Sequence, residues 1–518
     1  MAKLARSKAI AAPATNGQAK TMIPNSPQVK VAIVGVSRGC FSKELTATRM
    51  KKLVAGCKKA GFDVVPCKTI IENEGDAMKA LAEAYDADCN AAVIYLGNFG
   101  PEGPLSIFAA QFDGPVMAIG AAEESKGDLF DGRGDAYCGM LNASVNFGLR
   151  HVPVYIPQMP IGLPEELVPK IEHFITVARV VLGVADLKIF TFGPRPEDFY
   201  ACNAPIQPLY DLGVEVMENS ELDLFLLFQQ VDEKDPEVQA TAKDMARELG
   251  AGNTYPKLLP NLARLEVALM RFAEANLGSR QYGVFADKCW PAFEKAFGFT
   301  PCYVNSRLAT RGMPVACEVD IYGAFSEYLC QLASNAPATL LDVNNTVPRD
   351  LVTPADNLMG ASFEDLFMGF HCGNTPSCCM KNCSMKYQLI MHRVMEDPNK
   401  EPNISRGTLE GQIRPGPATF FRVQGGTDGV LRSYAAEGNV LDIDPHSFGG
   451  IGVFAIPNFA RFYRHVLIAK RFPHHGAVAF SKCGKALFDA VQLLGVDDIS
   501  VPLPRTMLYP GENPFEVL

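Results

Sequence analysis

Apolar and polar positions along the chain predict strands that alternate with helices in its first part. The run VKVAIVGV (Val29 to Val36) is apolar and rich in β-branched residues, which is typical of a strand buried on both faces. The next segment, SKELTATRMKKLVAGCKKAG, has helical periodicity and ends at Gly61. The runs AAVIYLG and GPVMAIG continue the alternation to about Pro160. This pattern predicts a parallel α/β domain at 29–160, after an N-terminal tail at 1–28.

The pattern begins again after a proline-rich linker, PVYIPQMPIGLPEEL. A helix is predicted from Pro164 to Leu182, and the strand-like run LKIFTFG follows it. We expect this second parallel-sheet α/β domain to extend over 161–345. From about Thr346, short β-like runs separated by Gly, Pro and Asn replace the helical periodicity. The fold class expected is therefore α/β, with two N-terminal α/β domains and a mostly antiparallel β domain at 346–518.

The composition excludes several classes of protein. The 518 residues contain 48 Lys and Arg against 57 Asp and Glu, a net charge of -9, which argues against a nucleic-acid binder. No apolar run reaches the roughly 18–20 residues that span a membrane, and the N-terminus lacks the apolar stretch of a secretory signal. The 15 cysteines are irregularly spaced and too few for a disulfide scaffold. We expect reduced thiols and a cytoplasmic protein.

Two carboxylates, Glu318 and Asp342, carry the strongest chemical signal. Each ends an apolar run in PVACEVDIYGAFSEYLCQLASNAPATLLDV, and a helix at about 321–334 separates the two runs. This spacing predicts one βαβ unit whose parallel, adjacent strands bring both carboxylates to the same sheet edge. Two carboxylates this close repel unless a cation offsets them, so a divalent metal such as Mg²⁺ or Mn²⁺ is expected. The alternative is that each carboxylate only caps the helix or loop after it.

Histidines supply the other candidate metal ligands. His474 and His475 stand together in FPHHGAVAF, just before an apolar strand, and His371 lies in FHCGNTPSCC. Histidine beside two carboxylates makes a mixed set of nitrogen and oxygen ligands that suits Mn²⁺. The other interpretation of the pair is two surface histidines in a turn.

Other motifs give weaker signals. Cys372, Cys378, Cys379 and Cys383 are spaced C-x5-C-C-x3-C, without the paired C-x2-C of structural zinc sites, so their role stays open. The dinucleotide-binding pattern G-x-G-x-x-G and the P-loop pattern are absent from the sequence. The single tryptophan, Trp290, suits either a core position or a surface on which a sugar stacks.

At these positions the chain resembles the L-fucose isomerase/L-arabinose isomerase family, most closely its L-fucose isomerase branch. The similar stretches cover about residues 29–505, and the Cys-Glu-x-Asp element at 317–320 is the most specific. They are FGPRP (192–196), KCWP (288–291), GMPVACEVDIYGA (312–324), LLDV (340–343), HCGN (371–374), GPATFFRVQG (416–425) and HHGAVAF (474–480).

The resemblance implies a sugar isomerase that uses Mn²⁺, with Mg²⁺ or Co²⁺ as alternatives. In the family a glutamate and an aspartate at the two matching positions bind the metal and act as the acid/base pair. Carried onto this sequence, the catalytic pair is Glu318 and Asp342, and His475 joins them as the preferred third ligand, with His371 as a candidate additional ligand. Substrate-binding groups are then expected at His474, Arg38, Trp290, Asn374 and Gln424.

The resemblance also implies a homo-oligomer, either a trimer or a hexamer, with active sites at subunit contacts. The expected reaction converts a free aldose of the L-fucose or D-arabinose type into its ketose through a cis-enediolate. The N-terminal tail and the CCMKNC segment depart from the family pattern, which leaves the sugar open. Two alternatives stand beside this interpretation: an isomerase or lyase for a modified sugar, and a non-catalytic protein that binds a sugar or a metal.

Overall fold

The computed structural model describes residues 25–516, whose contacts divide into two compact units. Unit 1 comprises Pro27–Ala185 and Asp489–Gly495, and unit 2 comprises Asp186–Phe488 together with 25–26 and 496–516. Residues 1–24 of the predicted tail lie outside the described residues. Within 25–516, no helix combines the length and the apolar character that a membrane span requires.

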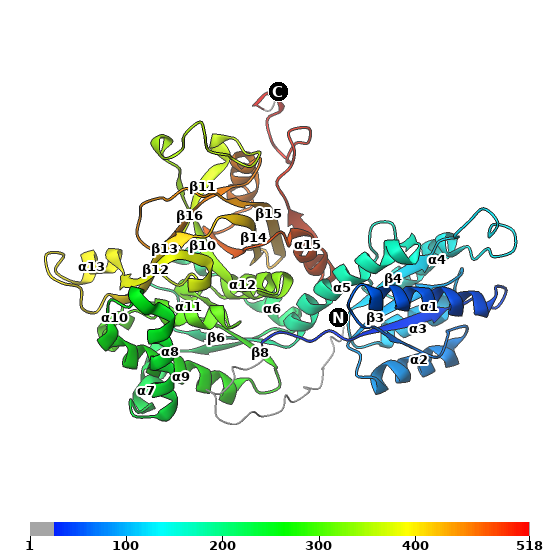
Figure 1. Cartoon of the computed structure of the whole chain (residues 1–518), viewed down its shortest axis with the longest axis horizontal. Coiled ribbons are helices and arrows are strands. Elements are labelled where there is room, and N and C mark those ends of the chain that lie inside the picture. Colours follow the sequence, from blue (N-terminus) through cyan, green and yellow to red (C-terminus); the bar gives the residue numbers. More distant parts are fainter. Residues whose placement is uncertain (1–24, 517–518) are drawn as a thin grey trace. The chain divides into compact units, whose positions relative to one another are not determined.

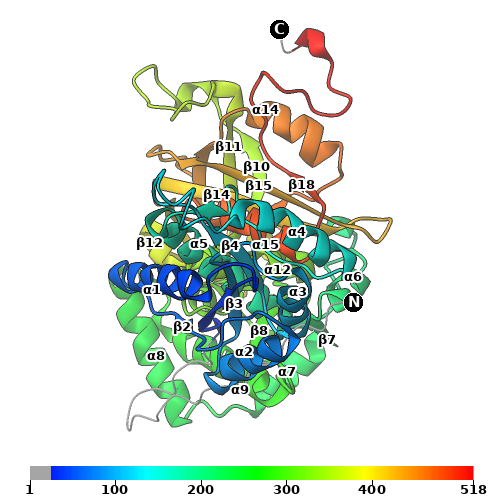
Figure 2. The ribbon, with the colours of Figure 1, turned by 90° about the vertical axis from the view of Figure 1, so that its right-hand side faces the viewer.

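Unit 1 contains a parallel sheet of five strands in the order β2-β1-β3-β4-β5. Strands β1, β3 and β4 are buried along their whole length because they are made of apolar residues and glycine. Figure 2 shows the sheet with α1 and α5 on one side and α2, α3 and α4 on the other. The strands are β1 (Val31–Val36), β2 (Val65–Pro66), β3 (Ala91–Leu96), β4 (Val116–Ala121) and β5 (Ile161–Gly162), and the helices are α1 (Lys43–Lys59), α2 (Glu74–Asp86), α3 (Glu102–Gln111), α4 (Ala136–Leu149) and α5 (Pro164–Ala185).

Unit 2 begins with a second parallel sheet, of four strands in the order β7-β6-β8-β9. Its strands are β6 (Leu187–Phe192), β7 (Glu215–Asn219), β8 (Tyr282–Ala286) and β9 (Val315–Ala316). The helices between them are α6 (Gln207–Asp211), α7 (Glu221–Gln230), α8 (Pro236–Leu249), α9 (Leu259–Asn276), α10 (Phe293–Phe297) and α11 (Cys302–Thr310).

A mostly antiparallel sheet of nine strands forms the remainder of unit 2, in the order β12-β13-β16-β11-β10-β17-β14-β15-β18. Strand β16 also pairs with β15, so the six strands from β16 to β15 close into a ring. The strands are β10 (Ala338–Thr346), β11 (Leu366–His371), β12 (Met380–Tyr387), β13 (Arg406–Ile413), β14 (Gly416–Gly425), β15 (Leu431–Val440), β16 (Gly450–Ala455), β17 (His475–Ala479) and β18 (Asp498–Ser500). Two parallel sheets followed by this sheet confirm the expected fold class.

Helix α12 (Ile321–Ser334) connects the two sheets of unit 2 and is almost completely buried. It packs against β8 and β9 of the parallel sheet and against β10, β14 and β17 of the antiparallel sheet (Figure 1). The helix begins where the sequence predicts, because the Asp320 side chain caps it by accepting a hydrogen bond from the backbone N–H of Gly323 (2.8 Å).

The predicted βαβ unit around α12 is wrong. Strand β9 belongs to the parallel sheet, whereas β10 pairs antiparallel with β11 and with β17. The physical reason is that β9 has only two residues and offers a short edge, while the later strands β11 and β17 cover both edges of β10. Glu318 and Asp342 therefore come from different sheets.

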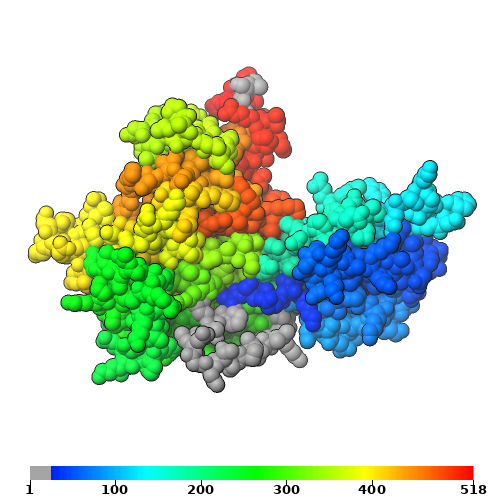
Figure 3. All heavy atoms as spheres, viewed as in Figure 1, coloured from blue at the N-terminus to red at the C-terminus, as the bar shows by residue number. Residues whose placement is uncertain are grey.

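The cysteine-rich segment and the residues after it lie at an edge of unit 2. Strand β12 is the terminal strand of the large sheet, and α13 (Leu389–Met395) follows it. In Figure 3 the yellow part of the chain that contains α13 projects from the surface of the unit.

Candidate active site

Three neighbouring strands of the antiparallel sheet bring Asp342, His475 and His371 together. Asp342 on β10 pairs directly with His475 on β17, and on its other side with Phe370 of β11, the residue before His371. Both histidines are buried, and their ring centroids lie 6.0 Å apart. The strand register thus brings His475 next to side chains that precede it by more than a hundred residues in the sequence.

Glu318 reaches the same place from the parallel sheet. It follows β9 in a short turn (Cys317–Val319), in which Glu318 and Val319 have φ of 56° and 54°. Positive φ is costly for residues with a Cβ, so the surrounding structure must hold this backbone. Asp287 does so, because its carbonyl accepts from the N–H of Val319 (2.8 Å) and its N–H donates to the carbonyl of Ala316 (3.0 Å).

The imidazole of His475 lies between the two carboxylates. Its Nε2 is 3.1 Å from Glu318 Oε2 and 3.4 Å from Asp342 Oδ1. The Nε2 atom of His371 is 3.8 Å from Glu318 Oε2, and that of His474 is 3.9 Å from Asp342 Oδ1. The side chain of His475 is 1% exposed and that of His474 is 34% exposed, so His475 is the inner member of the pair.

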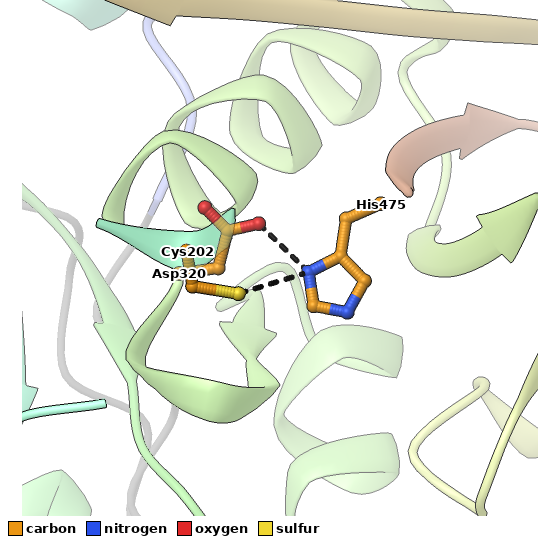
Figure 4. A group of neighbouring side chains, drawn as sticks. All are labelled: Cys202, Asp320 and His475. Carbon is orange, nitrogen blue, oxygen red and sulfur yellow. Dashed lines mark hydrogen bonds and ion pairs between the residues drawn. The ribbon is translucent and has the colours of Figure 1, made fainter. Parts of the chain in front are cut away.

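Asp320 fixes the other ring nitrogen of His475. The Nδ1 atom lies 2.8 Å from Asp320 Oδ2 and 3.7 Å from Cys202 Sγ (Figure 4). Arg422 donates from Nη1 to Asp320 Oδ2 and from Nη2 to Asp320 Oδ1, both at 2.8 Å, and both residues are buried. A carboxylate on Nδ1 sets the orientation of the ring and leaves Nε2 directed towards Glu318 and Asp342.

Opposite charges keep the buried carboxyl groups ionised. Burial by itself would raise the pKa of Glu318, but the imidazoles of His371 and His475 outweigh it and hold this pKa far below its usual range. Burial acts on Asp320 in the same direction, and the Arg422 guanidinium together with His475 holds its pKa far below the usual range as well.

The donor atoms around this cluster fit a divalent metal ion. Glu318 Oε2 is buried and receives no well-aligned hydrogen bond, although His475 Nε2 lies 3.1 Å from it, and such a carboxylate oxygen in the interior calls for a cation or a donor. Carboxylate oxygens with imidazole nitrogens suit Mn²⁺. Glu318 and Asp342 belong to different groups of possible metal-ligand atoms, and His475 Nε2 lies between the two carboxylates. Within 25–516, the groups whose possible ligand atoms all lie within 4.8 Å are Cys317–Glu318–His371, Asp342–His474–His475 and Cys202–Asp320–His475.

Two of the residues predicted to bind substrate lie on one aromatic surface. Trp290 meets Phe199 edge-on at 6.3 Å, and Phe199 meets His474 edge-on at 5.3 Å. Burial and the adjacent His475 lower the pKa of His474 to about 4, so its imidazole is neutral at pH 7. A neutral, half-buried imidazole beside aromatic rings can donate or accept one hydrogen bond from a sugar hydroxyl.

The other three predicted substrate residues have different surroundings. Gln424 Oε1 accepts from Arg422 Nε (2.8 Å) and Nη2 (2.7 Å), so Gln424 supports the arginine that holds Asp320. Asn374 is buried, and its Oδ1 has no hydrogen-bond partner. Arg38 belongs to unit 1, where its Nη2 lies 2.8 Å from Glu102 Oε1.

The four cysteines of the C-x5-C-C-x3-C pattern are not gathered around one point. The sulfurs of Cys378 and Cys379 lie 3.8 Å apart, and Cys372 Sγ accepts from Gln388 Nε2 at 3.3 Å. In the part of the chain that the structure describes, none of Cys372, Cys378, Cys379 and Cys383 belongs to a possible metal-binding group.

Sequence reasoning missed Asp320, Arg422 and Cys202. Asp320 lies two residues after Glu318 in the specific CEVD element, and Arg422 is the one charged residue in the strand GPATFFRVQG. A lone arginine in a buried strand must find a carboxylate, and that signal was available in the sequence. Cys202 gives no comparable signal.

Two family models match this chain. Residues 32–185 match the N-terminal domain of fucose/sulfoquinovose isomerases. Residues 369–500 match the C-terminal domain of L-fucose isomerase. The second match includes strands β11, β14 and β17, which carry His371, Arg422 and His475.

Curated relatives give the same result. Sulfoquinovose isomerase of Clostridium sp. (strain MSTE9) is 27% identical over 303 residues, which are 57% of this chain and 61% of the relative. That of Alkalicoccus urumqiensis is 28% identical over 304 residues, 56% of this chain and 60% of the relative. The chain thus matches about three fifths of the length of these relatives. Sulfoquinovose isomerase of Priestia aryabhattai is 24% identical over 345 residues, 65% of this chain and 70% of the relative. With both domain models matched in order, the chain belongs to the L-fucose isomerase family.

Proposed function

We propose that this protein is a metal-dependent ketol isomerase, which interconverts an aldose and its ketose. The observation that carries the proposal is the position of His475 Nε2 between Glu318 Oε2 (3.1 Å) and Asp342 Oδ1 (3.4 Å). Membership of a family of sugar isomerases supports the same reaction class.

The metal that we propose is Mn²⁺, with Mg²⁺ or Co²⁺ as alternatives. Glu318, Asp342 and His475 would hold it, and His371 is a candidate fourth ligand because it lies 3.8 Å from Glu318. When bound, such an ion stabilises the negative charge that develops on the two reacting sugar oxygens.

The two carboxylates are proposed to move the protons. One removes the proton from C2 of the open-chain aldose and returns it to C1 of the cis-enediolate, and the other transfers a proton from O2 to O1. The carboxylate of Glu318 is ionised at neutral pH, which is the state that a proton acceptor requires. The neutral His474 and the aromatic surface of Phe199 and Trp290 would contact the sugar.

Two kinds of sugar are candidates for the substrate. A free aldose of the L-fucose or D-arabinose type follows from the sequence resemblance. Sulfoquinovose, which carries a sulfonate, is the second candidate, because the relatives of 27% and 28% identity are sulfoquinovose isomerases.

An assay of metal-stripped protein tests the proposal. The protein is incubated with L-fucose, D-arabinose, L-arabinose and sulfoquinovose, each with and without Mn²⁺, and ketose formation is measured. We expect ketose from at least one sugar, restored by the metal. Protein that binds Mn²⁺ but converts none of these sugars would contradict the proposal and favour a protein that binds a metal or sugar without catalysis.

We further propose that the protein is a homo-oligomer in which α4 contacts a second copy of the chain. One face of α4 presents apolar residues at intervals of four, each 58–73% exposed, and the loop before it adds two more. These six side chains expose on the order of 700 Å² per copy, close to the roughly 800 Å² that each partner contributes to a standard interface. They are Tyr137, Leu141, Val145, Leu149, Leu129 and Phe130.

Charges at the two ends of α4 favour antiparallel pairing with the α4 of the second copy. The segment before the helix carries Asp131, Arg133 and Asp135, a net negative charge, and the exposed Arg150 follows the helix, so a twofold contact places each Arg150 near a negatively charged segment. Leu141→Asp is expected to reduce the mass measured by light scattering, whereas Met78→Asp on α2, a partly exposed apolar position, is the matched control. An unchanged mass for Leu141→Asp would place the contact elsewhere.

A further inference from the structure

We propose that Cys378 and Cys379 form a dithiol site that reacts with hydroperoxides and closes into a reversible disulfide. The two sulfurs lie 3.8 Å apart. Cys378 is exposed, whereas Cys379 is buried. This site is separate from the proposed isomerase chemistry and does not depend on it.

The local backbone holds both thiols in place. The pair ends a short 3-10 turn (Ser377–Cys379) that leads into β12. Arg414 donates from Nε to the carbonyl of Cys378 (3.1 Å) and from its backbone N–H to the carbonyl of Cys379 (2.9 Å). Both peptide groups are thereby fixed on one neighbouring residue, so the two sulfurs remain next to each other.

The surroundings of Cys378 make it the reactive member of the pair. The thiol of Cys379 and the side chain of Thr310 lower the pKa of Cys378 to about 6, against the effects of partial burial and of Glu248. A thiolate that is exposed and present at neutral pH is the species that attacks peroxides. Cys379, whose pKa the same contact and burial raise, remains a thiol and can act as the resolving group.

The proposed reaction has two steps. The Cys378 thiolate attacks one oxygen of hydrogen peroxide, which breaks the O–O bond, gives a sulfenic acid and releases hydroxide that takes up a proton to become water. The thiol of Cys379 then attacks this sulfur, forms the S–S bond and releases a second water. In total, two thiols and one hydrogen peroxide give one disulfide and two waters.

Adjacency in the sequence should make this disulfide easy to reduce. A trans peptide bond keeps neighbouring Cα atoms about 3.8 Å apart, which is shorter than the roughly 4.4–6.8 Å of ordinary disulfides. Strained disulfides have higher reduction potentials and are the labile ones. A small thiol such as glutathione is therefore expected to reopen it.

Peptide mapping of the full-length protein tests the proposal. The protein is treated with hydrogen peroxide, free thiols are alkylated, and trypsin is added. Cleavage after Lys381 places Cys383 on the separate peptide NCSMK, so a disulfide to Cys383 appears as two linked peptides. Cys372 shares a peptide with the pair, and fragmentation distinguishes it from them. We expect a Cys378–Cys379 disulfide that forms at least tenfold faster than oxidation of Cys40 and Cys138, two other exposed cysteines, and that glutathione reverses.

Two variants sharpen this test. Cys379→Ser is expected to stop at the sulfenic acid, which dimedone traps, and Cys378→Ser should slow oxidation of the segment to the rate of Cys138. Oxidation of Cys378 no faster than that of Cys138, or a disulfide from Cys378 to Cys372 or Cys383 instead, would overturn the proposal.

Discussion

The two sides of the His475 ring differ sharply in how their charges are satisfied. On the Nδ1 side, Asp320 receives two hydrogen bonds from Arg422 and is 1% exposed, so the charges form a closed, buried network. On the Nε2 side, Glu318 and Asp342 have no arginine or lysine partner among the described residues, and Glu318 Oε2 lacks a hydrogen bond. The first side has the features of a support and the second those of a site for a cation.

This difference teaches that burial alone does not identify a functional carboxylate. Asp320 and Glu318 are both buried, lie two residues apart and have lowered pKa values. What separates them is the partner, because a permanently charged guanidinium neutralises Asp320, whereas Glu318 meets only imidazoles. A bound cation could replace those imidazole contacts without breaking the network beneath them.

Removing the charge of Glu318, on the Nε2 side of the His475 ring, should have the largest effect. Glu318→Gln is expected to lower kcat by about 10³-fold or more, because the variant loses the group proposed as both a base and a metal ligand. It should also weaken Mn²⁺ binding, measured by calorimetry. Glu364→Gln, a change at an exposed glutamate, is the control and should be neutral. Activity close to wild type in Glu318→Gln would refute the proposed role of Glu318 in catalysis and metal binding.

Removing the ion pair between Arg422 and Asp320, on the Nδ1 side of His475, should destabilise the protein. Arg422→Met leaves Asp320 without its arginine in the interior, and the free energy of unfolding is expected to fall by about 3–5 kcal/mol. Arg432→Met on the neighbouring strand β15 removes partly exposed ion pairs with Asp428 and Asp498, so it should cost less than about 1 kcal/mol. Urea unfolding of metal-free protein measures both values. Equal decreases in the free energy of unfolding for the two variants would mean that the buried Asp320–Arg422 pair stabilises the fold no more than a partly exposed ion pair does.

A third buried carboxyl, Glu294, extends the comparison because both of its oxygens lack a hydrogen-bond partner. Burial raises the pKa of Glu294 from 4.5 to about 8. The unfolded chain releases this proton near pH 4.5 and the folded protein near pH 8, so its contribution to stability is complete below pH 4.5 and is lost as the pH rises to about 8.

Glu294→Gln should remove that pH dependence. Relative to wild type, its free energy of unfolding is expected to rise by on the order of 3 kcal/mol between pH 4.5 and pH 8. Urea unfolding of metal-free protein at several pH values measures this difference. Parallel pH profiles for the two proteins would show that Glu294 is ionised in the fold.

The smallest of the expected effects concerns the contact between Asp320 and the Nδ1 atom of His475. Asp320→Asn keeps the shape of the side chain but loses the charge that orients His475, and Mn²⁺ affinity is expected to fall 10–100-fold. Cys202→Ser, which alters an uncharged neighbour of the same nitrogen, should change the affinity less than about threefold. Metal titration of the folded variants measures these affinities. Equal Mn²⁺ affinities in Asp320→Asn and wild type would show that Asp320 does not influence metal binding through His475.

The sequence predicted the order of the sheets and the bounds of α12, because these depend on local patterns of apolar residues and on the cap at Asp320. It also brought Glu318 and Asp342 into one neighbourhood, although through a βαβ unit that does not exist. The error arose because strands can pair with partners that are distant in the sequence, and β10 pairs with strands that begin 20 and 129 residues after it ends.

The interactions that hold His475 and Glu318 in place were harder to predict from the sequence. The contact between Asp320 and Arg422 joins residues 102 positions apart, and no local pattern specifies it. The positive φ of Glu318 and Val319 likewise depends on the backbone of Asp287, which only the folded structure brings close.

The closed ring of six strands has a consequence for how the chain is made. Strand β17, which carries His475, lies between β10 and β14 although it leaves the ribosome after both of them. Until Ala479 has been synthesised, β10 and β14 keep unpaired edges, which are surfaces prone to aggregation. A nascent or truncated chain that ends before His475 is therefore expected to need a chaperone, and the proposed metal site cannot form until the last strand of the ring has been inserted.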